Sequence, residues 1–477
     1  MGLIVSPHIK IRPDGNRAIL FSVNPTNSIY GNCFRFLNPA QAITLSLFNG
    51  KRDLTDVVEI VAYLFDLDTQ TASHEVDALL SLPVNNEHTI GTFIIDVSDI
   101  DIKSMRLYDP KAFIPDKNQL IPDDPRCNIP CSMIVLPTMR CYTNCRYCYA
   151  DRNGFRGKEF DVPLFKDLLR QAKNCGIETV NFSGGDIFCR SDAFELIEYT
   201  LSRGMYPNIP TKYPLSKDQI ERLSEMGLST IQISIDALDS NIIDDLVAVS
   251  PGYGNRILQT LNYLGEIGIK VRTNTVLTPY NIRDAINLAK YLTKQPYIIK
   301  SNFTCYGRSI YHHHENMFCP SEMIHIFKND FDKIKNIFPA KIFFSGLVSD
   351  PYKGDEAERT TRFSKRSFCT ASRRGFVVLP DGRVTICEEL YFHDSFIIGD
   401  LNKQSLMEIW ASPKAMELAH PSQALVPDGA CRDCLDFRTC HEGLGRCFRE
   451  CIKSYGIHRP HWPDPRCPKA PIGNRIA

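Results

Sequence analysis

Three cysteines, Cys141, Cys145 and Cys148, lie within the eight residues CYTNCRYC at the spacing C-x3-C-x2-C. Thiolates are the usual ligands of iron–sulfur clusters, and a cubane cluster generally takes four of them, one for each iron. Three thiolates leave one iron open, and an open metal position can hold a substrate or a cofactor, as in catalytic zinc sites. The spacing therefore indicates a catalytic cluster, with a structural zinc site and chance as the alternatives.

Eight further cysteines gather near the C-terminus, in a stretch of short apolar runs and turns. They are Cys369, Cys387, Cys431, Cys434, Cys440, Cys447, Cys451 and Cys467. Disulfides do not persist in the cytosol, so in a cytosolic chain this concentration indicates metal or redox chemistry. We expect metal to supply part of the stability of this region, because periodic apolar segments are scarce in it. Zinc is the alternative metal, since C-x2-C also occurs in zinc ribbons.

The other cysteines are scattered, and small buried hydrophobic side chains are the simplest interpretation of them. They are Cys33, Cys127, Cys131, Cys175, Cys189, Cys305 and Cys319. The run His312, His313 and His314 has metal-binding side chains, but we favour a solvated loop there.

Charge and hydropathy exclude two classes of partner. The chain carries 55 basic and 55 acidic side chains, so no net field attracts it to nucleic acid or to an anionic membrane. No apolar run approaches the length that crosses a bilayer, and the N-terminus lacks the pattern of a secretory signal. We therefore expect a cytoplasmic protein that recognises its partners by shape.

Between the two cysteine groups, apolar strand-like runs alternate with helical patterns. The runs span residues 133–137, 179–182, 208–211, 230–235, 270–277 and 298–304. This alternation predicts an α/β fold with a partial TIM-like (β/α)6 barrel over residues 132–345, because a closed barrel needs eight such units. Ligands bind at the carboxyl ends of barrel strands, and the loop of Cys141 follows the first strand.

The N-terminal region has a different pattern. Strand-like runs at 17–23, 33–37 and 92–97 accompany helical patterns at about 38–50, 54–65 and 71–82. Asn38 and Pro39 supply the N-cap and first residue of the first helix. These elements predict a winged-helix domain over residues 1–103, followed by a linker over 104–131 that is rich in proline and aspartate. The second helix is acidic, which argues against the phosphate contacts of a DNA-binding protein.

The cysteine loop, with the aromatic Tyr147 before its third cysteine and its place after strand one of a partial barrel, resembles that of the radical S-adenosylmethionine (SAM) superfamily. The resemblance implies that Cys141, Cys145 and Cys148 hold a [4Fe-4S] cluster whose open iron chelates SAM. It also implies that Tyr147 packs beside the adenine. In that family an electron from the cluster breaks SAM to give a 5′-deoxyadenosyl radical, which abstracts hydrogen from unactivated carbon.

A second match to the superfamily is FSGGDIF, at the end of the second strand. By this resemblance Gly184, Gly185 and Asp186 bind the SAM ammonium, in a family that commonly has Glu where this chain has Asp. Ser234 in IQISIDA is similar to the family's ribose contact, and Asp236 lies beside it.

The carboxylate of SAM lacks its expected partner. Relatives often carry an arginine for it a short distance past the ribose-binding serine, and this chain has Val247 there. Arg256 and Arg272 are the two candidates to replace that arginine.

The C-terminal cysteines resemble the SPASM extension of peptide-modifying radical SAM enzymes in all but one interval, where Leu444 stands in place of a cysteine. The resemblance implies that residues 346–477 hold two auxiliary [4Fe-4S] clusters. One would be ligated by Cys431, Cys434, Cys440 and Cys467, and the other by Cys369, Cys387 and Cys447. If Cys451 joins the second set, both clusters are closed and pass electrons; otherwise one iron is open to a substrate thiol.

The segment FRFLNPAQAITLSLFNGKRDLTDVVEIVAYL resembles the PqqD-like precursor-recognition element of ribosomal peptide pathways. In that element a leader peptide adds as a strand to the exposed edge of the wing. A winged helix that serves only as a structural cap is the alternative.

Together these resemblances imply a radical SAM/SPASM oxidoreductase that modifies a ribosomally made precursor peptide. The expected product is a thioether or carbon–carbon cross-link, whose leftover electron the auxiliary clusters accept. The expected partners are the precursor, held by its leader, and an electron donor such as flavodoxin or ferredoxin. Three alternatives stay open: a peptide epimerase in which Cys305 or Cys319 returns a hydrogen atom, an oxidase of protein side chains as in sulfatase maturation, and a zinc-binding winged-helix regulator.

Overall fold

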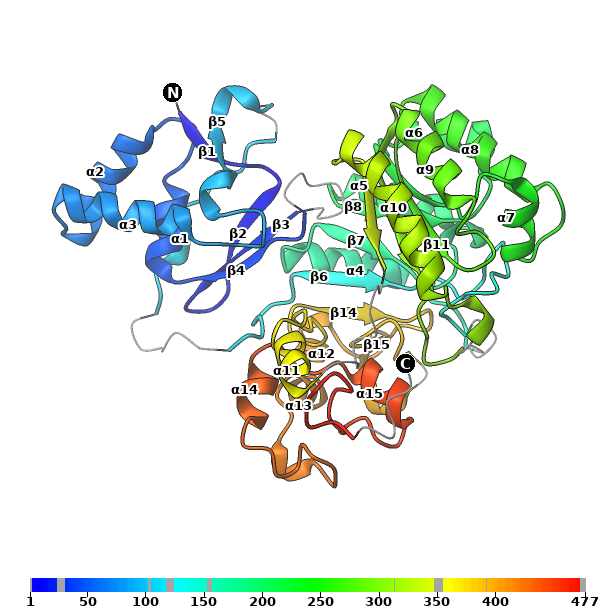
Figure 1. The fold of residues 1–477 in the computed structure, drawn as a ribbon. Coiled ribbons are helices and arrows are strands. Elements are labelled where there is room, and N and C mark those ends of the chain that lie inside the picture. The colour runs from blue at the N-terminus through cyan, green and yellow to red at the C-terminus, as the bar shows by residue number, and fades with distance from the viewer. Residues whose placement is uncertain are drawn as a thin grey trace. The chain divides into compact units, whose positions relative to one another are not determined.

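The computed structural model describes residues 2–23, 31–101, 104–116, 124–151, 157–312, 314–346, 355–391 and 393–471. The chain divides into two compact units, Met1–Ile129 and Pro130–Ala477. Figure 1 colours the first unit from blue to cyan and the second from cyan to red. The first unit holds the elements predicted for a winged helix, and the second holds the barrel strands and both functional cysteine groups.

The first unit combines three helices with antiparallel strands. Its elements are β1 (Leu3–Val5), β2 (Ile9–Pro13), β3 (Ala18–Ser22), β4 (Phe34–Leu37), α1 (Pro39–Ser46), α2 (Leu54–Phe65), α3 (Thr69–Ser81) and β5 (Ile94–Asp96). β2, β3 and β4 form one sheet in that order, and β1 pairs with β5. The predicted helices and strands are present, and β1 and β2 are additional.

The start of α1 shows how the sequence sets these boundaries. The Asn38 side chain accepts a hydrogen bond from the Gln41 backbone N–H at 2.9 Å, and the Gln41 side chain accepts one from the Asn38 N–H at 3.0 Å. This reciprocal pair satisfies backbone donors that a helix start leaves without partners, and Pro39 occupies the first helical position, where its missing N–H is not needed. Asn38 and Pro39 therefore act as predicted.

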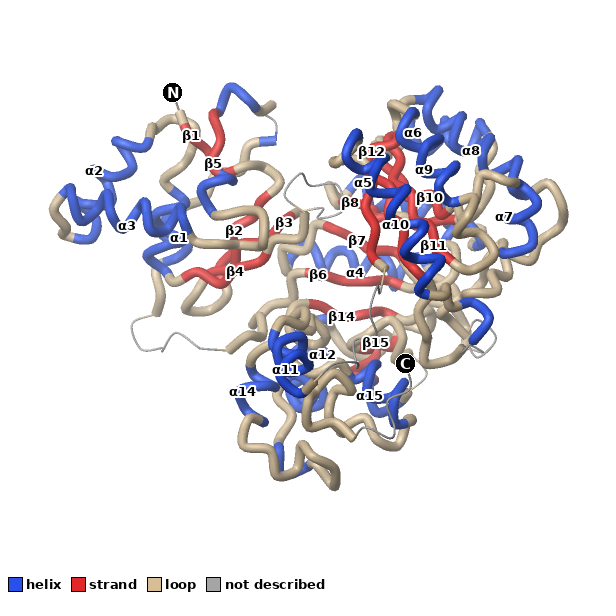
Figure 2. Tube along the Cα trace, viewed as in Figure 1, coloured by secondary structure: helices blue, strands red, loops and turns tan. Residues whose placement is uncertain are grey.

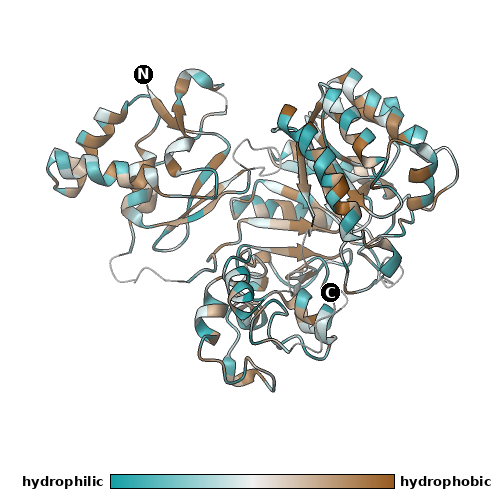
Figure 3. Cartoon of the chain, in the orientation of Figure 1, coloured by the Kyte–Doolittle hydropathy of each residue, from teal (hydrophilic) through white to brown (hydrophobic). Residues whose placement is uncertain are grey.

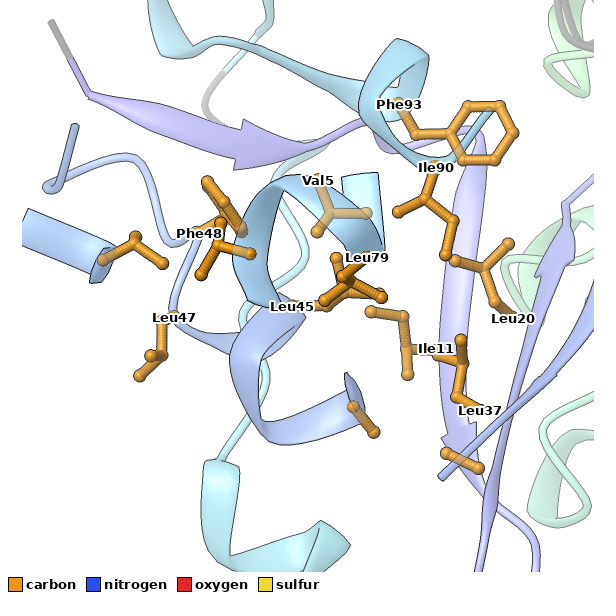
Figure 4. Packing of buried hydrophobic residues seen from close by; sticks show 14 of the residues in the cluster. Val5, Ile11, Leu20, Leu37, Leu45, Leu47, Phe48, Leu79, Ile90 and Phe93 are labelled. Carbon is orange, nitrogen blue, oxygen red and sulfur yellow. The ribbon is translucent and has the colours of Figure 1, made fainter. Parts of the chain in front are cut away.

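The helices and strands of the first unit enclose one apolar core, shown in Figure 4. Its buried side chains include Val5, Ile11, Leu20, Leu37, Leu45, Phe48, Leu79, Ile90 and Phe93. The full cluster draws on α1, α2 and α3 and on strands β1 to β4. The unit therefore has the independent core that a domain requires.

The segment predicted as a linker differs from that expectation in its described parts. The Tyr108 hydroxyl accepts a hydrogen bond from the Ile11 N–H at 3.2 Å and donates one to the Ile9 carbonyl at 3.3 Å. Phe113 is buried, and Tyr108 packs against the core. Residues 104–116 therefore pack on β2, and the first compact unit extends to Ile129.

The second unit is built on parallel strands, shown in red in Figure 2. They are β6 (Ser132–Val135), β7 (Thr179–Phe182), β8 (Tyr206–Asn208), β9 (Pro210–Thr211), β10 (Thr230–Ser234), β11 (Lys270–Leu277), β12 (Ile298–Cys305) and β13 (Ile342–Ser345). β8 and β9 are the single run predicted at 208–211, interrupted at Ile209. All six predicted strands are confirmed, and β13 extends the series by pairing parallel to β12.

Helices cover one face of these strands. They are α4 (Val162–Asn174), α5 (Ala193–Ser202), α6 (Lys217–Glu225), α7 (Ser240–Leu246), α8 (Tyr253–Ile267), α9 (Ala285–Lys294) and α10 (Ser321–Ile337). The ring of Phe182 on β7 stacks on Phe165 of α4 with centroids 6.2 Å apart, and in Figure 3 these helices alternate between brown and teal residues, as amphipathic helices do. In the described part of the chain, no helix is long and apolar enough to cross a membrane.

The C-terminal region joins the barrel by strand pairing. β14 (Gly375–Val378) pairs parallel with β6 and antiparallel with β15 (Arg383–Thr385), which pairs with β16 (Ile397–Asp400). The helices of the region are α11 (Glu356–Ser364), α12 (Leu406–Trp410), α13 (Pro413–Ala419), α14 (Phe437–Glu442) and α15 (Phe448–Tyr455). The cysteine-rich region therefore continues the barrel sheet.

Buried apolar side chains are more numerous in the first half of this region than the sequence pattern suggests. Tyr391, Phe396 and Trp410 are among the largest fully buried side chains of the chain. Apolar burial therefore stabilises residues 375–419, whereas buried apolar side chains are sparse around the cysteines that follow, where metal is expected to contribute.

The pairing of β14 with β6 depends on Gly375, which lies opposite Ser132. A substitution at Gly375 therefore tests this part of the fold. A Cβ added at Gly375 would lie 2.2 Å from Ser132 Oγ and 2.5 Å from the Ser132 carbonyl oxygen. We expect Gly375→Ala to destabilise the second unit by about 1–3 kcal/mol, because the two paired strands must separate. Thermal unfolding should show a lower midpoint for Gly375→Ala than for the control Gly307→Ala, whose added methyl group meets no atom within 4 Å. Equal midpoints would contradict this account of the joint.

Candidate functional site

The cysteine loop follows β6 and is fastened to the end of α7. The Asn144 N–H donates to the Val247 carbonyl at 2.8 Å, and the Arg146 N–H donates to the Leu246 carbonyl at 2.9 Å. The last carbonyls of a helix have no partner within the helix, so they are available to hold this loop. Val247, which stands where relatives carry an arginine, thus contacts the loop through its backbone.

The other end of the loop rests on the glycines of FSGGDIF. The Gly185 N–H donates to the Thr138 carbonyl and the Asp186 N–H donates to the Arg140 carbonyl, both at 2.8 Å. A Cβ at Gly185 would lie 2.2 Å from the Arg140 oxygen, and Gly184 has φ +86°. Both glycines are therefore needed where the backbone after β6 approaches β7, and their contact with SAM stays a prediction.

The Asp186 carboxylate has a structural role in this arrangement. It accepts hydrogen bonds from the Thr211 hydroxyl at 2.7 Å and from the backbone N–H groups of Phe188, Lys212 and Tyr213 at 3.1, 2.9 and 3.1 Å. Burial raises the pKa of Asp186, and these hydrogen bonds oppose that shift. The carboxylate holds the turn after β9 in place, and the expected contact with the SAM ammonium stays a prediction.

That turn places the Lys212 side chain against Asp236, a buried carboxylate beside the cysteine loop. Lys212 Nζ lies 2.6 Å from Asp236 Oδ2, and the Asp236 side chain is only 1% exposed. Asp236 also accepts hydrogen bonds from the Tyr147 hydroxyl and from the Val276 N–H. Burial opposes the charge on Lys212, but the Asp236 carboxylate raises its pKa, so the lysine is a cation at neutral pH.

Tyr147 is buried within this group, 5.5 Å from Lys212 Nζ to the ring centroid. Burial, together with the Asp236 charge, raises the pKa of Tyr147 well above its usual value, so the phenol stays a neutral donor. Tyr147, Asp236 and Lys212 thus form a hydrogen-bonded triad next to Cys145. The stacking of Tyr147 on adenine is a prediction that this position permits.

The chemistry of the donors fits an iron–sulfur cluster at the loop. Cys141, Cys145 and Cys148 are half-buried, and thiolates select iron–sulfur clusters or zinc. Thr143 Oγ1 lies 3.3 Å from Cys145 Sγ, and the Ala150 N–H donates to Cys148 Sγ at 3.4 Å. Over the described ranges, no three His, Cys, Asp or Glu side chains converge as they would on a single metal ion. A cluster of several irons spaces its thiolates more widely than one ion does.

A cavity in the C-terminal region collects the cysteines predicted for one auxiliary cluster. It has a volume of about 490 Å³, and its lining includes Cys431, Cys434, Cys440 and Cys467. Arg366 Nη2 donates to Cys440 Sγ at 3.2 Å, and Lys469 Nζ donates to Cys434 Sγ at 3.4 Å. Four thiols and two cations around one cavity suit an anionic four-thiolate cluster.

Two thiols of the second predicted set have raised pKa values. Burial raises the pKa of Cys387 to about 12 and that of Cys447 to about 11, and the nearby thiols of Cys369 and Cys447 contribute to these shifts. Cys451 is fully buried, and its thiol donates to the Trp462 carbonyl at 3.3 Å. Its ligation of the second auxiliary cluster stays a prediction.

Glu388 links the two cysteine regions and was missed by the sequence patterns. The Ser183 hydroxyl donates to Glu388 Oε2 at 2.7 Å and lies 3.2 Å from the Tyr149 hydroxyl. Glu388 follows Cys387, whereas Tyr149 follows Cys148. Burial raises the pKa of Glu388.

Lys212 was also missed, although a signal for it exists. It directly follows the predicted strand 208–211, and polar residues at the carboxyl ends of barrel strands commonly take part in the site. Of the two arginines proposed for the SAM carboxylate, Arg256 is exposed on α8 and Arg272 is buried on β11.

The scattered cysteines match their interpretation only in part. Cys33, Cys127 and Cys175 are buried, but Cys131, Cys189, Cys305 and Cys319 are half-buried, so reading them as buried hydrophobes is wrong. The Cys319 thiol hydrogen-bonds to Cys305 at the end of β12, which lowers the pKa of Cys305.

The histidine run is described in part. The His312 and His314 rings stack with centroids 5.7 Å apart, and His312 Nε2 lies 3.2 Å from the Ala150 carbonyl. His313 lies outside the described residues.

The ion pair of Lys212 and Asp236 yields a stability test. Lys212→Met leaves the Asp236 charge buried without its cation, so we expect a loss of about 3 kcal/mol of unfolding free energy. The control Lys217→Met removes an exposed pair with Glu266, 3.4 Å long, and should cost less than about 1 kcal/mol. Denaturant unfolding of the full chain measures both losses. Equal losses would show that the buried pair stabilises the fold no more than the exposed pair does.

Known proteins resemble this chain in sequence or in fold. The PqqA peptide cyclase of Rhodopseudomonas palustris is 28% identical over 166 residues, which are 34% of this chain and 44% of that protein, so this chain spans less than half of its length. The PqqA peptide cyclase of Rhizobium meliloti is 24% identical over 362 residues, 74% of this chain and 90% of that protein. The crystal structure of Streptococcus suis SuiB bound to S-adenosylmethionine matches 99% of this chain and 100% of SuiB, with a TM-score of 0.64 and 17% identity. The fold of SuiB is therefore shared.

Two family models match this chain, and the matched ranges include the three-cysteine loop and the first four of the C-terminal cysteines. The radical SAM superfamily model matches residues 135–292, and the SPASM model, an iron-sulfur cluster-binding domain, matches residues 369–435. These domains imply SAM, a [4Fe-4S] cluster at the SAM site and auxiliary clusters in the C-terminal region. The chain therefore contains a radical SAM domain over residues 135–292, followed by a SPASM domain over residues 369–435.

Proposed function

We propose that this protein is a peptide-modifying radical SAM oxidoreductase that cross-links a ribosomally made precursor through a thioether or carbon–carbon bond. The observation that carries the proposal is the pairing, in one compact unit, of a three-cysteine loop at the barrel's carboxyl end with a four-cysteine cavity in the SPASM region. The similarity to PqqA peptide cyclases, and to SuiB, which was also solved with its precursor peptide SuiA, supports a peptide substrate.

In this proposal the chain's residues hold and orient the reactants. When bound, the cluster and SAM supply a 5′-deoxyadenosyl radical, which abstracts hydrogen from carbon. Cys141, Cys145 and Cys148 hold the cluster. Asp236, kept in place by Lys212, presents a buried carboxylate beside Tyr147. We assign Ser234, at the end of β10, and Asp236 to the ribose, and Gly184, Gly185 and Asp186 to the SAM ammonium.

A specific observation supports epimerisation as the second candidate. Cys305 ends β12 and is hydrogen-bonded to Cys319, so two thiols lie together at the carboxyl end of the barrel. A thiol there is placed to return a hydrogen atom to a peptide radical in the barrel.

We assign the first unit to leader binding. Among described residues β4 pairs only with β3, which leaves its second edge for an added strand. Next to the end of β4, a groove of about 370 Å³ lies among the three helices, lined by Asn38, Gln41, Phe65, Ala78 and Leu82 among others. Such a groove offers pockets for apolar side chains of a leader whose backbone pairs with β4.

We place the enzyme in the cytoplasm, because its eighteen cysteines require a reducing compartment. Flavodoxin or ferredoxin is the electron donor that we propose there.

The first test is the reaction itself. Anaerobically reconstituted protein should bind iron and release 5′-deoxyadenosine from SAM, and a precursor encoded beside it should lose the mass of two hydrogens on co-expression. Cys145→Ser should reduce both activities to background, because the open-iron cluster needs all three thiolates. Cys175→Ser, at a buried position outside the three sets, is the control. An unchanged mass with altered stereochemistry would favour the epimerase, and a wild-type protein without iron would refute both.

The second test concerns the leader. Ala78 is exposed on α3 and lines the groove, so Ala78→Trp should fill the groove without disturbing the core. We expect leader binding, measured by fluorescence anisotropy, to weaken roughly tenfold or more. Asp77→Trp, an exposed neighbour that does not line the groove, is the control and should bind normally. If both variants bind the leader with equal affinity, the groove is not part of the leader-binding site.

A further inference from the structure

Two cations lie side by side on the inner face of the barrel. Arg272 on β11 pairs in register with Lys300 on β12, and also with Gln232 on β10. Paired residues of parallel strands point to the same face of the sheet. The opposite face at this level, with Ile231 and Ile233, is fully buried under the helices. Arg272 and Lys300 therefore point away from the helices, into the barrel.

Arg272 lacks a counter-ion. It is 5% exposed, and its Nε is buried without a hydrogen-bond partner. Its Nη2 donates to Asn208 Oδ1, a neutral oxygen. Among the residues that the structure describes, no carboxylate pairs with it, and burial lowers its pKa to about 10, which still leaves it charged at neutral pH.

Lys300, in register with Arg272 on the next strand, is half-buried. Its Nζ lies 4.5 Å from the centroid of the Phe343 ring on β13, and it forms no ion pair within the described ranges. A buried cation without a counter-ion is costly. An anion bound on this face would supply the counter-ion that Arg272 lacks, and Lys300 would add a second positive charge nearby.

The surrounding side chains are arranged to serve a polar ligand. Asn181 Nδ2 donates to the Met133 carbonyl at 3.1 Å, and Asn208 Nδ2 donates to Asn181 Oδ1 at 3.1 Å. This chain of amides fixes Asn208 with its oxygen towards Arg272. Other inner-face amides are half-buried rather than buried, so space remains beside them: Gln232, Asn274 and Asn302.

Arg272 lies deeper in the barrel than the residues assigned to SAM. Ser234 pairs in register with Asn274, two residues beyond Arg272, and Asp236 accepts a hydrogen bond from the Val276 N–H, four residues beyond it. At about 3.3 Å per residue these separations are roughly 7 and 13 Å along the strand. A role of Arg272 at the SAM carboxylate stays a prediction, and the SAM affinity of Arg272→Gln tests it.

We propose that Arg272 and Lys300 form a binding site for a carboxylate of the substrate peptide, deep in the barrel. The guanidinium offers a fork of donors that matches a carboxylate, and the ammonium adds a second charge. The inference rests on the proposed function and narrows it to peptides whose modified segment carries an acidic group. That group is either an Asp or Glu side chain or the terminal α-carboxylate, since both have the same chemistry.

Calorimetric titration of the full chain, reconstituted and saturated with SAM, tests the site with three probes. N-acetyl-L-glutamate α-amide carries only a side-chain carboxylate, N-acetyl-L-glutamine carries only an α-carboxylate, and N-acetyl-L-glutamine amide is neutral. We expect one acid to bind roughly tenfold or more tightly than the neutral probe, because charged hydrogen bonds are lost without the carboxylate. The preferred acid identifies the source of the group.

Variants assign the binding to these cations. Arg272→Gln and Lys300→Gln should each remove most of the preference for the acid, while Arg203→Gln, at an exposed arginine after α5, should keep it. Asn208→Asp gives Arg272 a counter-ion of its own, so it should abolish acid binding and raise the unfolding temperature. This second variant keeps the test decisive if Arg272→Gln does not fold.

Three results would overturn the inference: wild-type protein that binds no acid, acid binding that Arg272→Gln and Asn208→Asp leave intact, or a loss of SAM affinity in Arg272→Gln. Probe binding needs no catalysis, so its outcome is separate from that of the proposed function. If the enzyme modifies its precursor but binds neither acid, the proposed function stands and the proposed carboxylate site is refuted. If the protein binds an acid but modifies no peptide, the carboxylate site stands and the proposed function is refuted.

Discussion

The position of the cysteine loop depends on backbone hydrogen bonds at both of its ends. The carbonyls of Thr138 and Arg140 accept from the N–H groups of Gly185 and Asp186, and the N–H groups of Asn144 and Arg146 donate to the end of α7. A short loop rich in polar residues has no core of its own, so these bonds set where its thiols lie. The glycines of FSGGDIF serve this purpose because any side chain there would collide with the loop.

The charged side chains inside the barrel have two kinds of surroundings. Near the cysteine loop, Asp236 has a cation, a phenol and a backbone N–H around it, so its charge is satisfied before any ligand arrives. Deeper in the barrel, no carboxylate among the described residues pairs with Arg272 or Lys300. A satisfied charge keeps a site rigid, whereas an unsatisfied one gives binding energy to a ligand that supplies the missing partner. The contrast separates a charge that the fold already satisfies from charges that a substrate could satisfy.

Sequence patterns predicted the strands of the barrel and missed much of what holds the site together. Runs such as 270–277 are continuous, rich in β-branched residues and bounded by turns, so local pattern is sufficient for them. β1 and β13 are short strands whose partners are distant in sequence, and a short segment with few residues shows no period. Tyr108 looked like part of a linker because its two hydrogen bonds reach back nearly a hundred residues to β2.

The same contrast between local patterns and distant partners applies to the site residues. Cysteine spacing is local, so all three sets of thiols could be proposed from it, and one set proves to line a single cavity. The role of Asp186 could not be foreseen in this way, because, apart from the nearby Phe188 N–H, the groups that donate to it lie 25 to 27 residues further along the chain, at Thr211, Lys212 and Tyr213. The unpaired state of Arg272 is likewise invisible in sequence, since it depends on which strands flank β11.

The auxiliary thiols show how the C-terminal region can fold before its clusters are inserted. Burial raises the pKa of Cys431 and Cys447 to about 11, so without metal these side chains are neutral thiols that do not repel one another. A folded-state pKa above the unfolded value favours the folded state at pH below about 9, and this contribution is lost as the pH rises through about 11. Cluster binding has the opposite dependence, because thiolates are the ligands and protons must leave. The apolar core of residues 375–419 can therefore form first, with protonated cysteines beside it, and release protons only when iron and sulfide arrive.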